Sequence, residues 1–213
     1  MKNKANKRYV LAGLTGPTGS GKTTAARAMK DDGCYVIDCD IIAKEVLIYN
    51  KKCINEILEC FGQDLIDSEG LIKRKELAGR AFKSKQDTKL LNKITHHYII
   101  EEVMLRARNI IAKDKEAVII IDAPVLFESG LDKECDLTIA VIAPYEIRRE
   151  RIMKRDNISN EAAKKRMSAQ QEDSFYLSRC DYHLDGSKDS KYLYGESKKL
   201  IADIREKIYA KAD

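Results

Sequence analysis

The chain has 213 residues, of which 44% are hydrophobic and 34% charged, as is typical of a globular protein with one substantial core. Its 39 basic and 34 acidic residues give a net charge of +5, which is too mild to predict nucleic-acid binding. No apolar run approaches the roughly 18 residues that a membrane span needs. The six cysteines form no CxxC pair and no zinc-type cluster, so we expect free thiols in a cytoplasmic protein.

The first part of the chain and its middle alternate between predicted strands and helices. Strands are predicted at 8–16, 34–38, 117–124 and 136–144, and helices at 22–30 and 40–47. The strands are continuous apolar runs rich in Val and Ile, and helices separate them. This pattern indicates a parallel sheet covered by helices on both faces, so the predicted fold class is α/β.

The other segments are predicted to be mainly helical. Residues 51–112 are too long for one crossover between strands, and we interpret them as a small helical substrate subdomain. Two helices, at 145–156 and 160–170, belong to a predicted lid of about 146–177. A short strand near 181–186 and a closing helix at 189–211 complete the chain. The chain is therefore predicted to be a single domain over residues 1–213, in which residues 7–50, 113–145 and 178–213 form the nucleotide core.

The segment GLTGPTGSGKTT, residues 13–24, contains the Walker A spacing Gly-x-x-x-x-Gly-Lys-Thr between a predicted strand and a predicted helix. Its glycines permit backbone angles and close approaches that a Cβ would block. The loop N–H groups and the helix N-terminus would bind phosphate, Lys22 would reach the β- and γ-phosphate oxygens, and the Thr23 hydroxyl would ligate Mg²⁺. The residues predicted to hold a nucleoside triphosphate are Gly16, Thr18, Gly19, Ser20, Gly21, Lys22, Thr23 and Thr24.

Acidic residues follow two predicted strands, at the sheet edge where ligands bind in such folds. Asp38 and Asp40 follow the second strand, while Asp122 ends the third and Glu128 lies in the loop beyond it. A carboxylate facing the γ-phosphate could deprotonate an attacking hydroxyl or hold Mg²⁺ through water. The alternative is a structural role, for which Asp40 is placed as a suitable N-cap. The spacing leaves both interpretations open.

Arg148, Arg151 and Arg155 fall on one face of a predicted helix, at i, i+3 and i+7. The face is either solvated or the basic face of a lid that neutralises a transferring phosphoryl group, and we favour the lid. His96 and His97 lie in a helix predicted over about 86–111 and have no metal-ligating partners at useful spacing.

Over nearly the whole chain, these motifs resemble, in the same order, those of the dephospho-coenzyme A kinases. The similar segments are LTGPTGSGKTT (14–24), VIDCDIIAKEV (36–46), EGLIKRKELAGRAF (69–82), LNKITHH (91–97), IDAPVLFESGL (121–131), RIMKRD (151–156) and RMSAQ (166–170). The resemblance implies a P-loop kinase that uses ATP and Mg²⁺. It also implies the substrate, the ribose 3′-hydroxyl of dephospho-coenzyme A, which is phosphorylated in the last step of coenzyme A synthesis.

The resemblance implies roles for individual residues as well. Lys22, Asp40 and Arg151 would be catalytic, with Asp40 as the base, and Arg151 and Arg155 would close over the phosphoryl group. The residues implied for the substrate side are Asp40, Arg74, Phe82, His96, Asp122 and Glu128.

Two positions near the adenine side depart from the family pattern: Gly186 falls near a customary Asn, and Tyr176 near a customary Lys. Two other functions fit part of the sequence. GPTGSGKT also resembles the loop of tRNA isopentenyltransferases, but those chains lack the DAPVLFE segment and the paired arginines. A regulator that binds ATP without turnover would not need the acidic residues and arginines. We expect a monomer or weak homo-oligomer whose partner is dephospho-coenzyme A, with no nucleic-acid or membrane partner.

Overall fold

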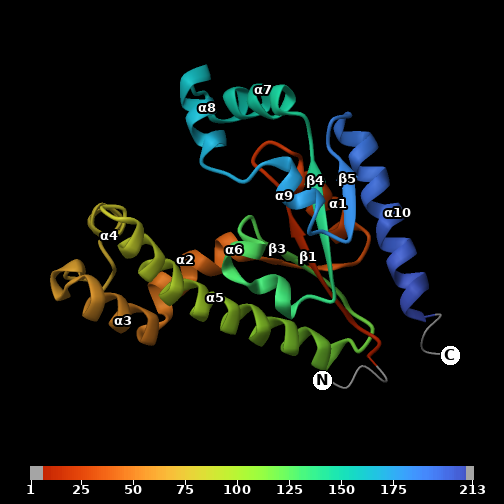
Figure 1. Ribbon diagram of the computed structural model, residues 1–213. Helices are drawn as coiled ribbons and strands as arrows, with labels where there is room; N and C mark the ends of the chain where they lie inside the picture. The colour runs from red at the N-terminus through yellow and green to blue at the C-terminus, as the bar shows by residue number, and fades with distance from the viewer. Residues whose placement is uncertain (1–6, 210–213) are drawn as a thin grey trace. The chain divides into compact units, whose positions relative to one another are not determined.

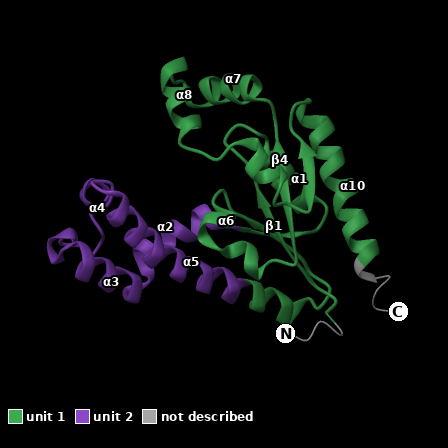
Figure 2. Cartoon of the chain, viewed as in Figure 1, with its two compact units in different colours: residues 1–37, 107–213 green, residues 38–106 purple. Residues whose placement is uncertain are grey.

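The structure is a computed structural model that describes residues 7–209, and the chain divides into two compact units (Figure 2). Unit 1 consists of residues 1–37 and 107–213, and unit 2 of residues 38–106. The predicted phosphate loop lies in unit 1. The helices predicted for the substrate side lie in unit 2.

The sheet has five strands in the order β2-β3-β1-β4-β5 (Figure 1). The strands are β1 (Val10–Thr15), β2 (Tyr35–Asp38), β3 (Val118–Asp122), β4 (Leu137–Ile142) and β5 (Tyr182–Asp185). β1 pairs in parallel with β3 and β4, and β4 pairs in parallel with β5. Every residue of β1 is buried, because the strand is central and covered on both faces. The predicted parallel α/β sheet is confirmed.

Two helices, α1 (Lys22–Asp31) and α10 (Ser190–Tyr209), pack against each other and share one core with the sheet (Figure 1). Alternate residues of β1 enter this core, because successive side chains of a strand point to opposite faces. The core also contains Val118, Ile120, Ile139, Val141, Ala25, Met29, Leu193, Ile201 and Ile204. The predicted closing helix is confirmed over the described residues, and positions 210 and 211 lie outside them.

Short helices cover β1 and β4 elsewhere: α6 (Leu126–Ser129), the 3₁₀ helix η2 (Leu131–Glu134) and α9 (Asp173–Leu177). At Gly13 of β1, a Cβ would lie 2.7 Å from Leu126 Cδ2, so glycine permits the close packing of α6 on this strand. On β4, Ala140 packs with Tyr176 and Cys180, and Phe175 lies against them. α9 therefore packs against the sheet of unit 1 through Phe175 and Tyr176.

The two basic helices predicted after β4 are α7 (Tyr145–Asp156) and α8 (Asn160–Ser168), and together we call them the α7–α8 hairpin. Ile152 of α7 is buried with Ala163 and Met167 of α8. Asn157 ends α7 in the left-handed conformation, with φ of 49°, which asparagine tolerates better than most residues. Ser159 then caps α8, since its side chain accepts a hydrogen bond from the Ala162 N–H.

Unit 2 is helical. Its elements are α2 (Cys39–Tyr49), α3 (Lys51–Phe61), the 3₁₀ helix η1 (Gln63–Leu65), α4 (Arg74–Ala81) and the part of α5 (Lys85–Lys113) up to residue 106. The stretch predicted as helical over 51–112 is thus divided into separate helices. Gly62 ends α3 with φ of 121°. The long helix predicted over about 86–111 is confirmed as α5.

Across the described residues, no helix has both the length and the apolar composition of a membrane span. All six cysteines are free thiols, as the sequence predicts, and Cys60 is exposed.

Candidate active site

The loop between β1 and α1, residues 16–21, is bent at three glycines. Gly16, Gly19 and Gly21 have φ of 146°, 80° and 107°, angles that side-chain-bearing residues rarely adopt. Space is limited as well: a Cβ at Gly16 would lie 2.4 Å from the Val141 carbonyl oxygen. The Walker A spacing therefore predicts both the backbone conformation and the packing of this phosphate loop.

Several backbone donors of the phosphate loop are available to an anion. In the described chain, no protein acceptor is bonded to the N–H groups of Gly19, Gly21, Lys22 or Thr23. The first turn of α1 contains no acidic residue that would neutralise the partial positive charge of the helix N-terminus. Grouped N–H donors at a helix N-terminus form a phosphate-binding site.

Lys22 makes an ion pair with Asp122, the last residue of β3. The register of the sheet places Asp122 beside Leu14 of β1, just before the phosphate loop begins. Both side chains are largely buried, with 17% and 12% of their surfaces exposed, so the pair is weakly screened by water. The structure therefore brings together two predicted site residues that lie 100 positions apart.

The three arginines of the basic face have different surroundings. Arg148 is only 6% exposed, and its guanidinium donates to the Ala143 carbonyl at 2.9 Å and to Asp173 at 3.1 Å. The prediction that Arg148 lies on a solvated or phosphate-facing surface is therefore wrong. Arg148 instead connects α7 to the end of β4 and to α9, because hydrogen-bond acceptors offset the cost of burying a guanidinium.

Arg151 and Arg155 also differ from one another. Arg151 donates to the carbonyl oxygens of Gly186 at 2.7 Å, Lys188 at 3.1 Å and Gly19 at 3.3 Å, so its charge lies at the phosphate loop. Arg155 makes two hydrogen bonds to Asp156, at 2.7 and 2.9 Å. The Arg155 contact lowers the pKa of the Asp156 carboxyl group.

The two departures from the family pattern now have structural explanations. A Cβ at Gly186 would lie 1.9 Å from the Ser20 carbonyl oxygen, so the backbone after β5 can approach the phosphate loop only with glycine at this position. Tyr176 of α9 is 2% exposed and packs against Ala140 of β4, and burial raises its pKa to about 12. Tyr176 therefore stabilises the fold.

One contact to the phosphate loop was not predicted from the sequence. The side-chain Oε1 of Gln170 accepts a hydrogen bond of 2.9 Å from the Thr18 N–H. Gln170 ends the RMSAQ segment, which carries the family resemblance but suggested no role for this residue. The sequence therefore marks the segment that contains Gln170, but it does not predict that Gln170 binds the Thr18 N–H.

In unit 2, the structure corrects the prediction for Asp40. β2 ends at Asp38, and Asp40 lies in the first turn of α2. The N-cap is Asp38, whose Oδ1 accepts from the N–H groups of Asp40 at 2.8 Å and Ile41 at 3.1 Å. The interpretation of Asp40 as the cap is therefore wrong. Its carboxylate is exposed and makes no hydrogen bond or ion pair with another described residue.

Other substrate-side candidates in unit 2 lie on α4 and α5. Arg74 begins α4 and donates to the Lys44 carbonyl of α2 at 3.2 Å. Phe82 follows the last residue of α4 and is 68% exposed, which is unusual for an aromatic side chain. His96 is half-buried on α5. Glu128, the remaining candidate, lies on α6 of unit 1 and is exposed.

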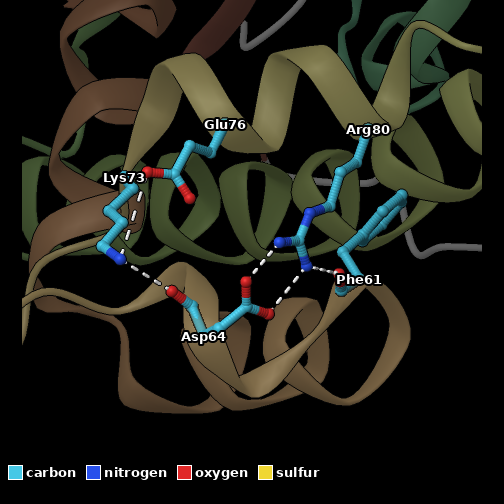
Figure 3. A network of polar contacts seen from close by, with 5 residues as sticks. All are labelled: Phe61, Asp64, Lys73, Glu76 and Arg80. Carbon is cyan, nitrogen blue, oxygen red and sulfur yellow. Dashed lines mark hydrogen bonds and ion pairs between the residues drawn. The ribbon is translucent and has the colours of Figure 1, made fainter.

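A polar network fixes α4 to the end of α3 (Figure 3). Arg80 donates to Asp64 through both terminal nitrogens and to the Phe61 carbonyl at 2.6 Å, while Lys73 donates to the Asp64 carbonyl at 3.0 Å. The Arg80 hydrogen bonds lower the pKa of the Asp64 carboxyl group. This network anchors the helix that begins with Arg74.

The side chains present fit a magnesium ion that is shared with a nucleotide. Among residues 7–209 there is no group of three His, Cys, Asp or Glu side chains that could enclose a metal. Mg²⁺ bound to a nucleotide needs fewer protein ligands, because phosphate oxygens and water supply most of its coordination. The Thr23 hydroxyl is exposed in the first turn of α1, and the Asp122 carboxylate pairs with the adjacent Lys22.

Curated relatives of this chain include several with the same name. Relatives named dephospho-CoA kinase include one from Corynebacterium glutamicum, 34% identical over 197 residues, covering 92% of this chain and 98% of that protein. Another, from Corynebacterium diphtheriae, is 38% identical over 181 residues, with coverage of 84% and 90%.

Solved structures agree on the fold. A dephospho-CoA kinase from Campylobacter jejuni superposes with a TM-score of 0.69 at 28% identity, covering 93% of this chain and 98% of that one. A Thermus thermophilus protein gives a TM-score of 0.75 at 24% identity, covering 92% and 98%. A shikimate kinase from Acinetobacter baumannii, with a TM-score of 0.55 at 14% identity, covers 94% and 96% and shares the fold.

The family model described as dephospho-CoA kinase (CoaE) matches residues 10–191, which include the phosphate loop, Asp122 and the α7–α8 hairpin. The chain belongs to the dephospho-CoA kinase family.

Proposed function

We propose that this protein transfers the γ-phosphoryl group of ATP to the ribose 3′-hydroxyl of dephospho-coenzyme A, which yields coenzyme A and ADP. The observation that carries the reaction class is the phosphate loop, with its available N–H donors and the buried Lys22 beside them. Membership of the dephospho-CoA kinase family, matched over residues 10–191, supports dephospho-coenzyme A as the phosphoryl acceptor. The reaction would complete coenzyme A synthesis, and we place it in the cytoplasm.

On the nucleotide side, binding of ATP exchanges partners at Lys22. The ammonium group now paired with Asp122 would bind the β- and γ-phosphate oxygens, while the loop N–H groups bind the phosphates. The positive charge of Arg151, held at the loop by the Gly19 carbonyl, would stabilise charge that develops on the transferring group. Arg155 would contribute less, because Asp156 already neutralises it.

Mg²⁺ would bind through Thr23, with Asp122 acting through water once Lys22 has turned to the phosphates. When bound, the ion neutralises phosphate charge and supports in-line transfer. This exchange explains why a lysine at the N-terminus of a helix, an unfavourable place for a cation, is kept beside a carboxylate.

On the acceptor side, we assign Asp40 as the general base that takes the proton from the 3′-hydroxyl. Its carboxylate is exposed and unpaired among the described residues, as a base that must receive a substrate proton requires. Arg74 would bind a phosphate of the substrate, and the exposed Phe82 would contact its apolar or aromatic part. His96 and Glu128 remain candidates for further substrate contacts.

The substrate panel that tests the proposal is dephospho-coenzyme A, adenosine, nucleoside monophosphates and pantetheine, each with Mg²⁺ and ATP in a coupled ADP-release assay. We expect ADP release that depends on dephospho-coenzyme A and is far slower with the other acceptors. Equal release with every acceptor, or release without any, would contradict the assigned substrate. Retention of tRNA together with no dephospho-coenzyme A turnover would favour the isopentenyltransferase alternative.

A further inference from the structure

Two side chains of one neighbouring segment contact the phosphate loop on two peptide groups that flank a third. Gln170 Oε1 accepts from the Thr18 N–H at 2.9 Å, and Arg151 donates to the Gly19 carbonyl at 3.3 Å. The Thr18 N–H belongs to the Pro17–Thr18 peptide, and the Gly19 carbonyl to the Gly19–Ser20 peptide. The peptide between them carries the Gly19 N–H, one of the donors available to phosphate. The orientation of this donor is thus determined from both sides.

Arg151 and Gln170 belong to one packed pair of helices and the residues that follow it. Arg151 is on α7, and Gln170 follows α8, where its own N–H donates to the Met167 carbonyl at 3.1 Å. α7 and α8 share a buried core, and Asp156 of α7 also pairs with Arg166 of α8 at 2.6 Å. A displacement of the α7–α8 hairpin would therefore move both contacts together.

Contact between α7 and the loop is close enough to transmit such a displacement. A Cβ at Gly19 would lie 2.7 Å from the Arg148 carbonyl oxygen, so the backbone of α7 lies directly on the loop. Arg148 is itself held by Ala143 and Asp173. The loop is therefore packed against α7, and Gln170 adds a directional bond at the neighbouring peptide.

We propose that Gln170 is a positioning residue that couples the α7–α8 hairpin to the phosphate loop. Its hydrogen bond holds the Pro17–Thr18 peptide so that the Gly19 N–H stays oriented for phosphate. The bond uses none of the four available N–H groups described above, so it supports nucleotide binding and does not compete with it. This inference rests on the proposed phosphate-binding role of the loop.

The test compares Gln170→Met, which keeps side-chain length but removes the acceptor, with Gln171→Met as a matched control. Gln171 is adjacent and exposed, and it makes no hydrogen bond with another described residue. Calorimetric titration of the full chain with MgATP, without acceptor, measures nucleotide affinity. A coupled assay then measures kcat and the KM for dephospho-coenzyme A.

We expect Gln170→Met to weaken ATP binding by about three- to tenfold, the effect of losing one hydrogen bond. The KM for dephospho-coenzyme A should stay within about twofold of wild type, and Gln171→Met should match wild type throughout. An ATP affinity within about twofold of wild type in Gln170→Met overturns the proposal, even if its melting temperature falls, because a purely structural bond would behave in that way.

Gln170→Ala provides a second variant, should the methionine alter folding, and the same affinity criterion applies to it. A wild-type protein that binds ATP but does not phosphorylate dephospho-coenzyme A would refute the proposed function, while the binding comparison would still decide the role of Gln170. A wild-type protein that binds no ATP would overturn both.

Discussion

Lys22 and Asp122 illustrate how two residues can stabilise the fold and serve the reaction. Lys22→Met should abolish turnover, because no other residue can replace its contact with the phosphates. It should also lower the free energy of unfolding by about 1–3 kcal/mol, since Asp122 is left largely buried without its cation. Adding Asp122→Asn should restore most of this stability but not turnover. Denaturant unfolding and ADP release measure the two effects.

A Lys22→Met variant with near-normal turnover would contradict phosphoryl transfer at this loop. A double variant no more stable than Lys22→Met would show instead that the ion pair contributes little to stability.

Arg151 and Arg155 lie one helical turn apart, but we expect different effects of substitution. Arg151→Ala should lower kcat by about 10²–10³-fold, because its charge lies at the phosphate loop. Arg155→Ala should lower kcat less than about tenfold, since Asp156 neutralises Arg155 in an exposed pair. Steady-state kinetics with saturating ATP compare the two variants. Equal losses, or a larger loss for Arg155→Ala, would contradict this assignment.

At the scale of single residues, the sequence predicts the site where local spacing determines the chemistry. The Walker A glycines predicted a bent loop because positive φ angles require them. Helical periodicity places Arg148 on a face of α7 but does not reveal that acceptors at the end of β4 and on α9 bury it there. Nor does the sequence predict the contact of Gln170, whose partner Thr18 is 152 positions away.

At the junction between β2 and α2, Asp38 and Asp40 are expected to have different functions. Asp38→Ala should cost about 1 kcal/mol of stability, because it removes the cap of α2, and it should leave kcat per folded molecule largely unchanged. Asp40→Asn should leave stability unchanged and lower kcat by about 10²–10⁴-fold, because the amide cannot accept the proton. Melting temperature and kcat of both variants test the assignment. An Asp40→Asn enzyme within threefold of wild type would leave Asp122 as the next candidate base.

Among the elements, the strands were predicted better than the helices of unit 2. A buried strand is an uninterrupted apolar run, so β1, β3 and β4 stand out in the sequence. The division between α3, η1 and α4 depends on the conformation of Gly62 and on the Arg80–Asp64 network, which are tertiary features. The predicted N-cap of α2, Asp40, lies two residues after the observed N-cap, Asp38. Helix boundaries commonly differ by one or two residues between assignments.

For the whole molecule, buried thiols predict a loss of stability at alkaline pH. Burial raises the pKa of Cys34, Cys53 and Cys180 from 9.0 to about 11. The unfolded chain therefore releases these protons first. The contribution of these thiols to stability is present below pH 9 and is lost as the pH rises toward about 11, by at most about 1.4 kcal/mol per pH unit for each thiol.

Urea unfolding at pH 8, 9 and 10 measures this slope. Cys34→Ala should make the slope shallower, and substitution of the exposed Cys60 by alanine should not change it. Stability that is constant or rises over this range would contradict the prediction.

The central claim is that this protein phosphorylates the ribose 3′-hydroxyl of dephospho-coenzyme A. The most direct measurement is ³¹P NMR of the product formed from MgATP and dephospho-coenzyme A, with the Lys22→Met/Asp122→Asn variant as a folded control. We expect the wild type to form one new phosphomonoester, coupled to the proton at the 3′ carbon, together with one equivalent of ADP, and the double variant to form none. Release of inorganic phosphate without a new phosphomonoester, or a phosphomonoester at another position, would contradict the claim.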